Sequence, residues 1–195
     1  EGDRVHGTFT DTPSTLRLAS ADPNLQNLAH HVRFANDFRR CIRARPGAIL
    51  QAPDYAGIEA VLTGYFIGDP VFIRLAKLGI HAYLTSHVVG KPASLSLSDA
   101  DLAAYFALMK EEHPVAYDTS KRVVHGTHYL LTPYGMAEQF PDIFPKRSVA
   151  EKLQGLYFDL CPKLKAWQSR TQELAHRQGF LGGPGQHPFG LRHEF

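Results

Sequence analysis

An acidic residue directly before a helical pattern is the first arrangement in this sequence that could support chemistry. Asp54 follows an apolar run at residues 49–52, which is typical of a buried strand, and Pro53 discourages strand pairing beyond it. A carboxylate at a strand-to-helix junction suits a hard cation such as Mg²⁺, which prefers oxygen ligands. The alternative is that Asp54 only caps a helix that begins near Tyr55.

A second group of reactive side chains recurs at intervals of four residues. Lys121, His125 and Tyr129 would lie on one face of a helix that starts near Thr119. The first two could hold a triphosphate, and the ring of the third could stack on a base. The alternative is an ordinary core helix with a stripe of tyrosines.

A hairpin and an amphipathic helix should position Asp54. Alternation at residues 38–45 predicts a strand, and Pro46-Gly47 predicts a turn that leads back to Asp54. The helix that follows should begin near Tyr55. Its apolar stripe is predicted to be Ile58, Val61, Leu62 and Tyr65.

Breakers and caps predict the other elements. Residues 4–10 alternate like a strand and lead into a long polar connection. Gly68-Asp69-Pro70 should end the first helix, and Ser98 should cap another. A long helix over about 149–178 is expected, interrupted near Pro162. Its buried stripe is predicted to be Leu153, Leu156, Tyr157, Leu160, Leu164 and Trp167.

Composition and charge exclude several classes of protein. The 195 residues carry a formal net charge of +2, which is compatible with nucleic acid without indicating it. Cys41 and Cys161 are far apart and predict neither a disulfide framework nor a cysteine zinc site. The histidines lack an H-E-x-x-H spacing, which argues against a histidine-dependent metal hydrolase.

The sequence also carries signals about location. It shows no transmembrane run and no signal peptide, and it starts without Met, as a fragment or processed piece would. We therefore expect a cytoplasmic protein. An organelle remains an open alternative.

The residues around Asp54 resemble a known motif. DYAGIE at residues 54–59 is similar to DYSQIE, the first palm motif of family A DNA polymerases. The resemblance implies that the Asp54 carboxylate and the Tyr55 backbone carbonyl bind two Mg²⁺ ions, with Mn²⁺ as an alternative. It implies that Tyr55 and Glu59 contact the dNTP and that Glu59 excludes ribonucleotides. Gly57 replaces the usual glutamine, so a side-chain contact is lost there.

Two further segments resemble the same family in the same order. TPSTLRLASADPNLQN at residues 12–27 is similar to TATGRLSSSDPNLQN, which implies contacts with primer and template; the alternative is a turn-rich loop. His81 occupies the histidine of a D-I-H-T segment, which implies contact with the triphosphate. The basic run at 38–45 could bind phosphates or only protect a sheet edge. The expected DNA-contacting residues are Arg17, Asn24, Gln26, Asn27, Arg39, Arg40, Arg43, Gly135 and Arg192.

The second reactive group resembles the fingers motif R-x-x-x-K-x-x-x-[FY]-G-x-x-Y-G in a phage-like form. Lys121 then stands for arginine and His125 for lysine, which implies that both stabilise charge on the leaving phosphates. Tyr129, Arg122 and Tyr134 join the expected dNTP-binding residues.

The register of this motif is open, because one extra residue precedes Tyr134. Pro133 could end or kink the helix and so allow the slip. A competing register anchored on Tyr134-Gly135 would align Arg122, Gly126 and Leu130 instead. That register removes the central cation and the aromatic ring.

The resemblance covers nearly the whole chain and implies an α+β fold. It is the fold of part of a polymerase palm, with an antiparallel hairpin and strands, joined to a helical fingers subdomain. The expected domains are residues 1–66 for the palm portion and 67–160 for the helical fingers. Residues 161–195 would form the end of the long helix and the return to the palm.

The implied function is template-directed DNA synthesis, the transfer of a nucleotide from a dNTP to a primer 3′-hydroxyl. The family's H-D-E motif, which carries the second metal-binding carboxylate, has no match here. We therefore expect a fragment or subunit that is completed by a second polypeptide or by the remainder of the chain. Primer-template DNA and dNTPs are the other expected partners, and a membrane is not. The resemblance also implies a bacterial or phage-infected cell, with the protein associated with the nucleoid. The alternative is a catalytically incomplete relative that only binds primer-template.

Overall fold

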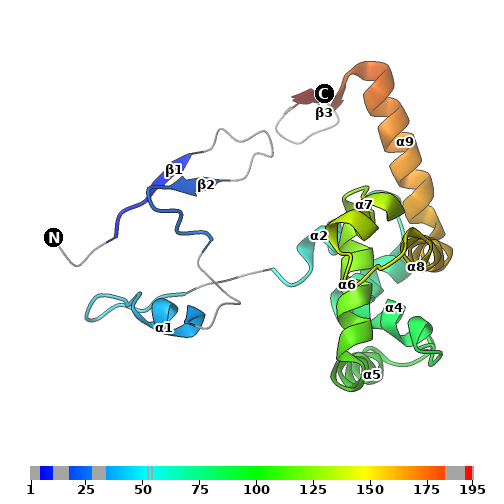
Figure 1. Ribbon diagram of the computed structural model, residues 1–195, viewed down its shortest axis with the longest axis horizontal. Coiled ribbons are helices and arrows are strands. Elements are labelled where there is room, and N and C mark those ends of the chain that lie inside the picture. Colours follow the sequence, from blue (N-terminus) through cyan, green and yellow to red (C-terminus); the bar gives the residue numbers. More distant parts are fainter. Residues whose placement is uncertain are drawn as a thin grey trace. The chain divides into compact units, whose positions relative to one another are not determined.

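The computed structural model describes residues 5–10, 18–27, 34–51, 53, 55–182 and 192–194. The chain has the predicted α+β class, with short antiparallel strands and a larger helical part (Figure 1). It divides into two compact units. One comprises Glu1–Asp54 with Gly182–His193, and the other comprises Tyr55–Leu181 with Glu194–Phe195.

Short strands and a loop dominate the described start of the first unit. β1 (Thr8–Thr10) pairs with β2 (Ala19–Ala21) in antiparallel register, so only the end of the strand predicted at 4–10 is observed. The Ser20 hydroxyl accepts the Leu25 backbone N–H at 3.1 Å, which folds the following loop back on β2. At the end of the chain, β3 (Phe180–Gly182) and β4 (Arg192–Glu194) form a second two-stranded sheet.

The strand predicted at residues 38–45 is wrong, because α1 (Ala35–Arg40) is a helix. Asp37 lies in its first turn and two arginines lie in its last, which is the charge order that the helix dipole favours. The Cys41 thiol also donates to the Asp37 carbonyl one turn earlier, at 3.3 Å. Local charge order therefore decides against the strand-like alternation.

The predicted hairpin is wrong as well, although its turn is observed. The Ala48 N–H donates to the Arg45 carbonyl at 3.0 Å, and Gly47 has φ 78°. Ile49 and Leu50 lie in no strand and are 79% and 64% exposed, while Ala52 lies outside the described residues. A strand needs a hydrogen-bonded neighbour, and the described residues place none beside this run.

In the part of the chain that the structure describes, eight helices build the second unit. They are α2 (Ile58–Ile67), α3 (Pro70–Leu78), α4 (Ile80–Val88), α5 (Asp99–Glu112), α6 (Pro114–His128), α7 (Pro133–Gln139), α8 (Arg147–Leu160) and α9 (Pro162–Gln178). The cap predicted at Ser98 is confirmed, and Asp69, which was expected only to end the preceding helix, caps α3. The Asp69 carboxylate accepts the Val71 N–H at 3.0 Å, and the Ser98 hydroxyl accepts the Asp101 N–H at 3.2 Å.

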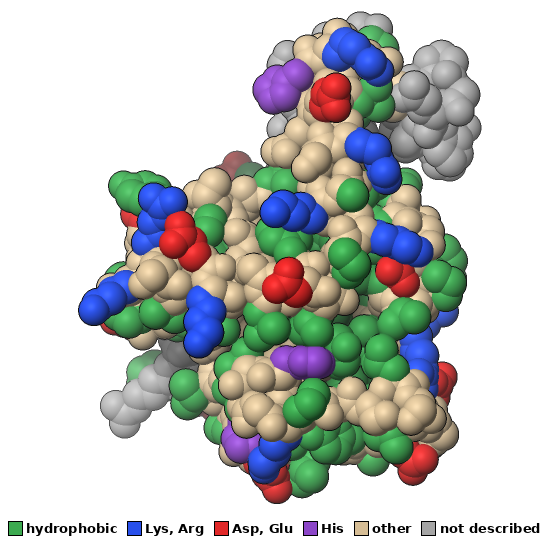
Figure 2. Space-filling model, turned by 90° about the vertical axis from the view of Figure 1, so that its right-hand side faces the viewer, with side chains coloured by type: hydrophobic (Ala, Val, Ile, Leu, Met, Phe, Trp, Pro, Cys, Tyr) green, Lys and Arg blue, Asp and Glu red, His purple; other side chains and the backbone are tan. Residues whose placement is uncertain are grey.

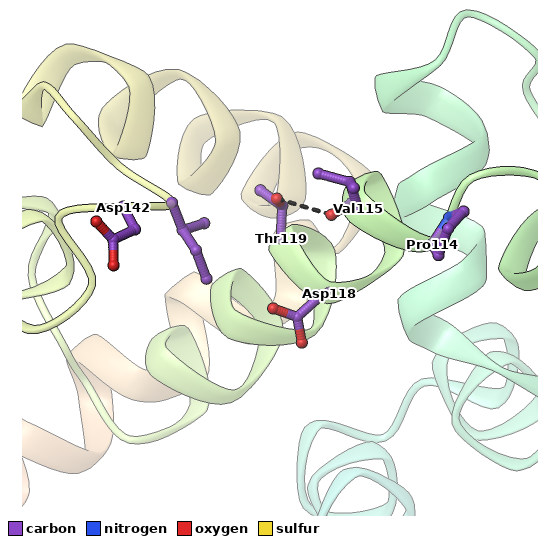
Figure 3. A pocket seen from close by; sticks show the side chains of 6 residues that line it. Pro114, Val115, Asp118, Thr119 and Asp142 are labelled. Atoms are coloured by element: carbon purple, nitrogen blue, oxygen red, sulfur yellow. Dashed lines mark hydrogen bonds between the residues drawn. The ribbon is translucent and has the colours of Figure 1, made fainter.

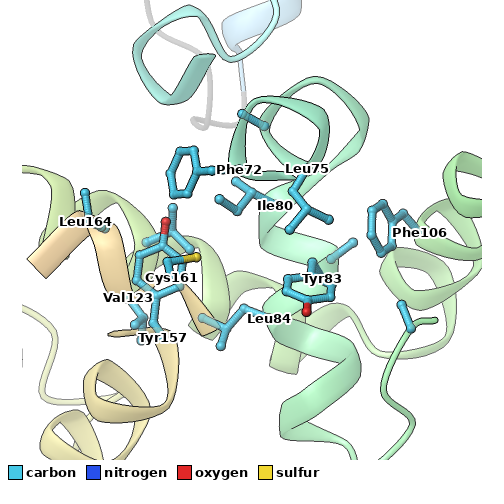
Figure 4. Packing of buried hydrophobic residues seen from close by; sticks show 14 of the residues in the cluster. Phe72, Leu75, Ile80, Tyr83, Leu84, Phe106, Val123, Tyr157, Cys161 and Leu164 are labelled. Atoms are coloured by element: carbon cyan, nitrogen blue, oxygen red, sulfur yellow. The ribbon is translucent and has the colours of Figure 1, made fainter. Parts of the chain in front are cut away.

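One hydrophobic core joins most of these helices (Figure 4). The stripe predicted for the long helix is confirmed, since Tyr157 and Leu164 are 1% and 0% exposed and the other four residues are partly buried. The interruption near Pro162 is confirmed, because Pro162 is the first residue of α9. Trp167 stacks on Phe66 of α2, with ring centroids 6.1 Å apart and planes 14° apart. Among the described residues, no helix combines the length and apolarity needed to span a membrane.

Helix α2 begins later than predicted and faces the core with a different side. Its N-cap is Gly57, which has φ 60° and makes no side-chain cap bond, so Asp54 is not the N-cap. Three members of the predicted stripe are exposed, and these are Ile58, Leu62 and Tyr65. The side chains that pack on the core are Ala60, Val61 and Ile67, and Gly64 is buried among them.

Gly64 explains this orientation of α2, because it allows a close approach to α3. A Cβ atom at Gly64 would lie 2.7 Å from Cγ1 and 3.1 Å from the backbone nitrogen of Ile73. Such contacts cannot be relieved by a side-chain rotation alone. The position of the small residue therefore decides which face of α2 is buried, more than the apolar spacing does.

Gly64→Ala is expected to lower the free energy of unfolding by about 1–2 kcal/mol, since overpacking outweighs the better helix propensity of alanine. Urea unfolding measures the change. Gly155 on α8 is the matched control, because a Cβ there meets nothing within 4 Å. Gly155→Ala should stabilise the protein by about 0.5–1 kcal/mol. Equal effects of the two substitutions would contradict the close approach.

Candidate functional site

Polar and aromatic side chains from three helices meet in the second unit. His81 comes from α4, Lys121 and His125 come from α6, and Glu59 comes from α2. The rings of His81 and His125 stack with centroids 5.1 Å apart and planes 14° apart. The rings of Tyr117 and His81 also meet edge to face, with centroids 6.1 Å apart and planes 84° apart. Sequence positions 59, 81 and 121–125 are thus brought together.

The electrostatics of this cluster favour neutral imidazoles around one ammonium group. Burial, together with smaller contributions from the nearby His125 and Lys121, lowers the pKa of His81 from 6.5 to about 4. Partial desolvation also lowers the pKa of His125. The charge of Lys121 lowers it as well, while the carboxylate of Glu59 opposes the shift. At neutral pH both rings are therefore uncharged and can donate one N–H each, and Lys121 supplies the positive charge.

Tyr129 follows α6 directly and extends the cluster to α2. Its hydroxyl donates to the Glu59 carboxylate at 2.7 Å, although both side chains remain exposed. The contacts with His81 and Glu59 thus bring three residues to one site, and these are Lys121, His125 and Tyr129.

The residues of the competing register have other surroundings. Arg122 lies 3.8 Å from the Asp118 carboxylate and packs over the Phe140 ring. A Cβ at buried Gly126 would lie 2.9 Å from Cε of Met136. Leu130 has φ 60° and lies past the end of the helix. Contacts within the protein therefore explain the residue types at positions 122 and 126 without a bound nucleotide.

The end of α6 differs from the prediction. The helix stops at His128, before Pro133, and Pro133 is the first residue of α7. Tyr134 is 63% exposed on α7, and the Gly135 N–H donates to the Thr132 hydroxyl at 3.2 Å. Pro133 therefore neither ends nor kinks the predicted helix.

His128 was not predicted from the sequence as part of the site, and it lies next to the cluster, close to His81 and His125. Its Nε2 and the Tyr157 hydroxyl are 2.8 Å apart, and its ring stacks on Phe72. Burial lowers the pKa of His128 to about 4, and His125 adds to the shift while Glu59 opposes it. Its position three residues after His125 was the available signal, because that spacing places both rings near each other on a helix.

The predicted metal and DNA residues belong mainly to the first unit. Asp54 and Arg17 lie outside the described residues, as does the side chain of Arg192 in β4. Tyr55 is 79% exposed. Within the described ranges, no group of three or more His, Cys, Asp or Glu side chains is arranged to hold a metal ion.

Other predicted DNA contacts have local partners. The Asn24 side chain accepts the N–H groups of Gln26 and Asn27 at 3.0 and 3.1 Å, which forms a turn. The Arg43 guanidinium donates to the Arg40 carbonyl at 3.3 Å. Arg40 lies 3.8 Å from Asp37, and Arg39 is exposed.

An open hollow beside the start of α6 is a poor site for a phosphate (Figure 3). Its lining comprises Pro114, Val115, Asp118, Thr119, Asp142 and Ile143. The two carboxylates would repel a polyanion. Figure 2 shows another face, where Lys and Arg side chains are interspersed with Asp and Glu, so that face does not favour a DNA backbone either.

Comparisons with known proteins agree on one family. The family model for DNA polymerase family A matches residues 1–183. The thermostable DNA polymerase I of Thermus aquaticus is 27% identical over 180 residues, which are 91% of this chain and 20% of that protein. DNA polymerase I of Caldicellulosiruptor bescii is 30% identical over 179 residues, covering 91% of this chain and 19% of that protein. The chain spans about a fifth of the length of these curated relatives.

A solved structure shares the fold. It is the POL domain of Pol1 from M. smegmatis, in complex with DNA primer-template and dNTP. It superimposes with a TM-score of 0.73 at 22% identity, over 98% of this chain and 30% of that chain.

Proposed function

Since the chain belongs to DNA polymerase family A, we propose that it contributes to template-directed DNA synthesis and that its helical unit binds the incoming dNTP. The observation that carries this proposal is the cluster of His81, Lys121 and His125 beside the Tyr129–Glu59 hydrogen bond. A triphosphate needs several donors and positive charge at one place, and this cluster supplies both.

The residues of the cluster would have distinct tasks. Lys121 binds the triphosphate through its charge, and the N–H groups of His81 and His125 donate to phosphate oxygens. The phosphate charge in turn favours protonation of these rings, which strengthens the contact. Tyr129 packs against the base and sugar, with its hydroxyl held by Glu59. Arg122, Tyr134 and Tyr55 complete the proposed dNTP-binding set.

The proposed metal ligands are the Asp54 carboxylate and the Tyr55 carbonyl. Both are oxygen donors, which is the ligand chemistry that Mg²⁺ and Mn²⁺ require, although Asp54 lies outside the described residues. Bound Mg²⁺ would lower the pKa of the primer 3′-hydroxyl and neutralise phosphate charge.

Primer-template DNA is the proposed partner of the first unit. The structurally similar M. smegmatis domain is in complex with primer-template and dNTP, which supports this choice. We assign the contacts to the DNA-contacting residues predicted from the sequence. We likewise propose residues 1–66 as the palm portion, residues 67–160 as the helical fingers, and residues 161–195 as the end of the long helix and the return to the palm.

Lys121→Met is expected to lower kcat/KM for dNTP by about thirtyfold, because it removes one charge-assisted contact with the triphosphate. Steady-state primer extension with the polymerase that contains this chain measures the change. Lys152→Met on the exposed face of α8 is the matched control and should have no effect. No extension by the unmodified polymerase, together with tight primer-template binding, would instead indicate a binding module.

Tyr129→Phe tests the register of the fingers motif. The Tyr129 hydroxyl can replace the hydrogen bond that a missing 3′-hydroxyl would make, so the parent enzyme should accept dideoxynucleotides. Loss of about 1 kcal/mol should increase discrimination against dideoxynucleotides roughly fivefold, and any rise in KM from the lost hydrogen bond to Glu59 affects both substrates and cancels in the ratio. The measurement is the ratio of dideoxy to deoxy incorporation. Equal ratios for the two proteins would favour the competing register.

A further inference from the structure

The turn that carries Tyr129 contains a residue unsuited to its backbone conformation. The Leu131 N–H donates to the Gly126 carbonyl at 2.7 Å, and the Leu130 N–H donates to the Thr127 carbonyl at 3.1 Å. This pair of bonds commonly closes a helix with glycine in the left-handed position. Here Leu130 occupies it with φ 60°, and leucine is disfavoured there. Contacts from outside the turn must therefore help to hold it.

Two glutamines from neighbouring helices make such contacts. Gln168 of α9, which is 6% exposed, donates its side-chain N–H to the Thr127 carbonyl at 2.7 Å. Gln154 of α8 donates to the Leu131 carbonyl at 2.9 Å and to the Thr127 hydroxyl at 3.2 Å. The Thr127 carbonyl lies in the last turn of α6, where carbonyls lack partners within the helix, and the Gln168 amide adds to the Leu130 N–H that it already accepts. The Leu131 carbonyl lies beyond the helix and accepts the Gln154 amide. Residues 127 and 131 are fixed in this way, two residues before and two residues after Tyr129.

We propose that Gln154 and Gln168 are positioning residues that hold Tyr129 against Glu59 for nucleotide binding. The role in nucleotide binding rests on the proposed function, whereas the clamp on the turn does not. Neither glutamine touches the His81, Lys121 and His125 cluster through a described hydrogen bond. Their effect is to order the turn before the nucleotide arrives, which reduces the conformational entropy lost on binding.

Amide hydrogen exchange tests the clamp without any nucleotide. Gln154→Met and Gln168→Met keep a side chain of similar length but remove the donor. The amides of Leu130 and Leu131 should then exchange at least roughly fivefold faster in each variant, because Gln168→Met removes one hydrogen bond that supports the turn and Gln154→Met removes two. Gln172→Met, at an exposed position one turn further along α9, is the matched control and should exchange like the parent. Unchanged exchange in both test variants would overturn the proposal.

Steady-state kinetics tests the positioning role. The KM for dNTP should rise roughly fivefold in Gln154→Met and Gln168→Met, with kcat within about twofold of the parent. A purely structural role would lower the active fraction and hence kcat, and would leave KM unchanged. A KM equal to that of Gln172→Met, despite faster exchange, would overturn the positioning role. Failure of the proposed function would appear separately, as absent dNTP incorporation by the unmodified polymerase.

Discussion

Asp54→Asn is expected to abolish nucleotide incorporation, with a loss of at least about a thousandfold, while primer-template affinity stays within a few-fold. Asparagine preserves the size of the side chain but removes the negative charge proposed to hold Mg²⁺. Duplex affinity depends mainly on phosphate contacts made elsewhere, so it should change little. Single-nucleotide primer extension and a direct duplex-binding measurement separate the two quantities.

The matched control for this substitution is Asp159→Asn, which removes one exposed carboxylate from α8. Extension by this control should equal that of the parent. Near-normal extension by Asp54→Asn would remove Asp54 from the proposed metal site. A parallel loss of extension and duplex binding would instead assign Asp54 to DNA binding or to the fold.

Acid is expected to weaken the fold through two partly buried histidines. The pKa values of His81 and His128 are lowered from 6.5 to about 4, so below pH 6.5 the unfolded chain binds protons that the folded chain does not. Their stabilising contribution is complete above pH 6.5 and is lost as the pH falls towards 4. At pH 5 each histidine should lower the free energy of unfolding by about 2 kcal/mol relative to pH 7.5. Urea unfolding at pH 7.5 and pH 5 measures the difference.

His128→Gln isolates one of these contributions. Glutamine can still pair with the Tyr157 hydroxyl but does not titrate, so the pH dependence should shrink by about 2 kcal/mol. His176→Gln, at an exposed position on α9, is the control and should keep the parent's pH dependence. The same acid sensitivity in His128→Gln and the parent would contradict the assignment to His128.

The sequence predicted best the features that are decided locally. Ser98 caps α5 because its hydroxyl reaches an N–H group only three residues away. The stripe of the long helix follows from a spacing that leaves one apolar face. The intervals of four in α6 likewise predicted that Lys121 and His125 lie close together on one helix, whereas the roles of these residues and of His81 in binding a nucleotide stay predictions.

Features that depend on distant partners were not predictable in the same way. The alternation at 38–45 suits a strand, but a strand also needs a neighbour, and the local charges of Asp37 and the arginines favour α1. The buried face of α2 depends on the fit of Gly64 against Ile73. The left-handed conformation of Leu130 could not be predicted from the sequence, because glycine is the usual residue at that position after a helix. Its supports, Gln154 and Gln168, come from other helices.

The stacking of Phe66 on Trp167 makes the fluorescence of Trp167 an intrinsic probe of the contact between α2 and α9. Trp167 is the single tryptophan of the chain, so its emission arises from one known place where α2 meets α9. Glu59, the partner of Tyr129, lies on the same helix α2 as Phe66. A displacement of α2 when the dNTP binds would alter the surroundings of the indole. Stopped-flow fluorescence could then time that motion without an attached label.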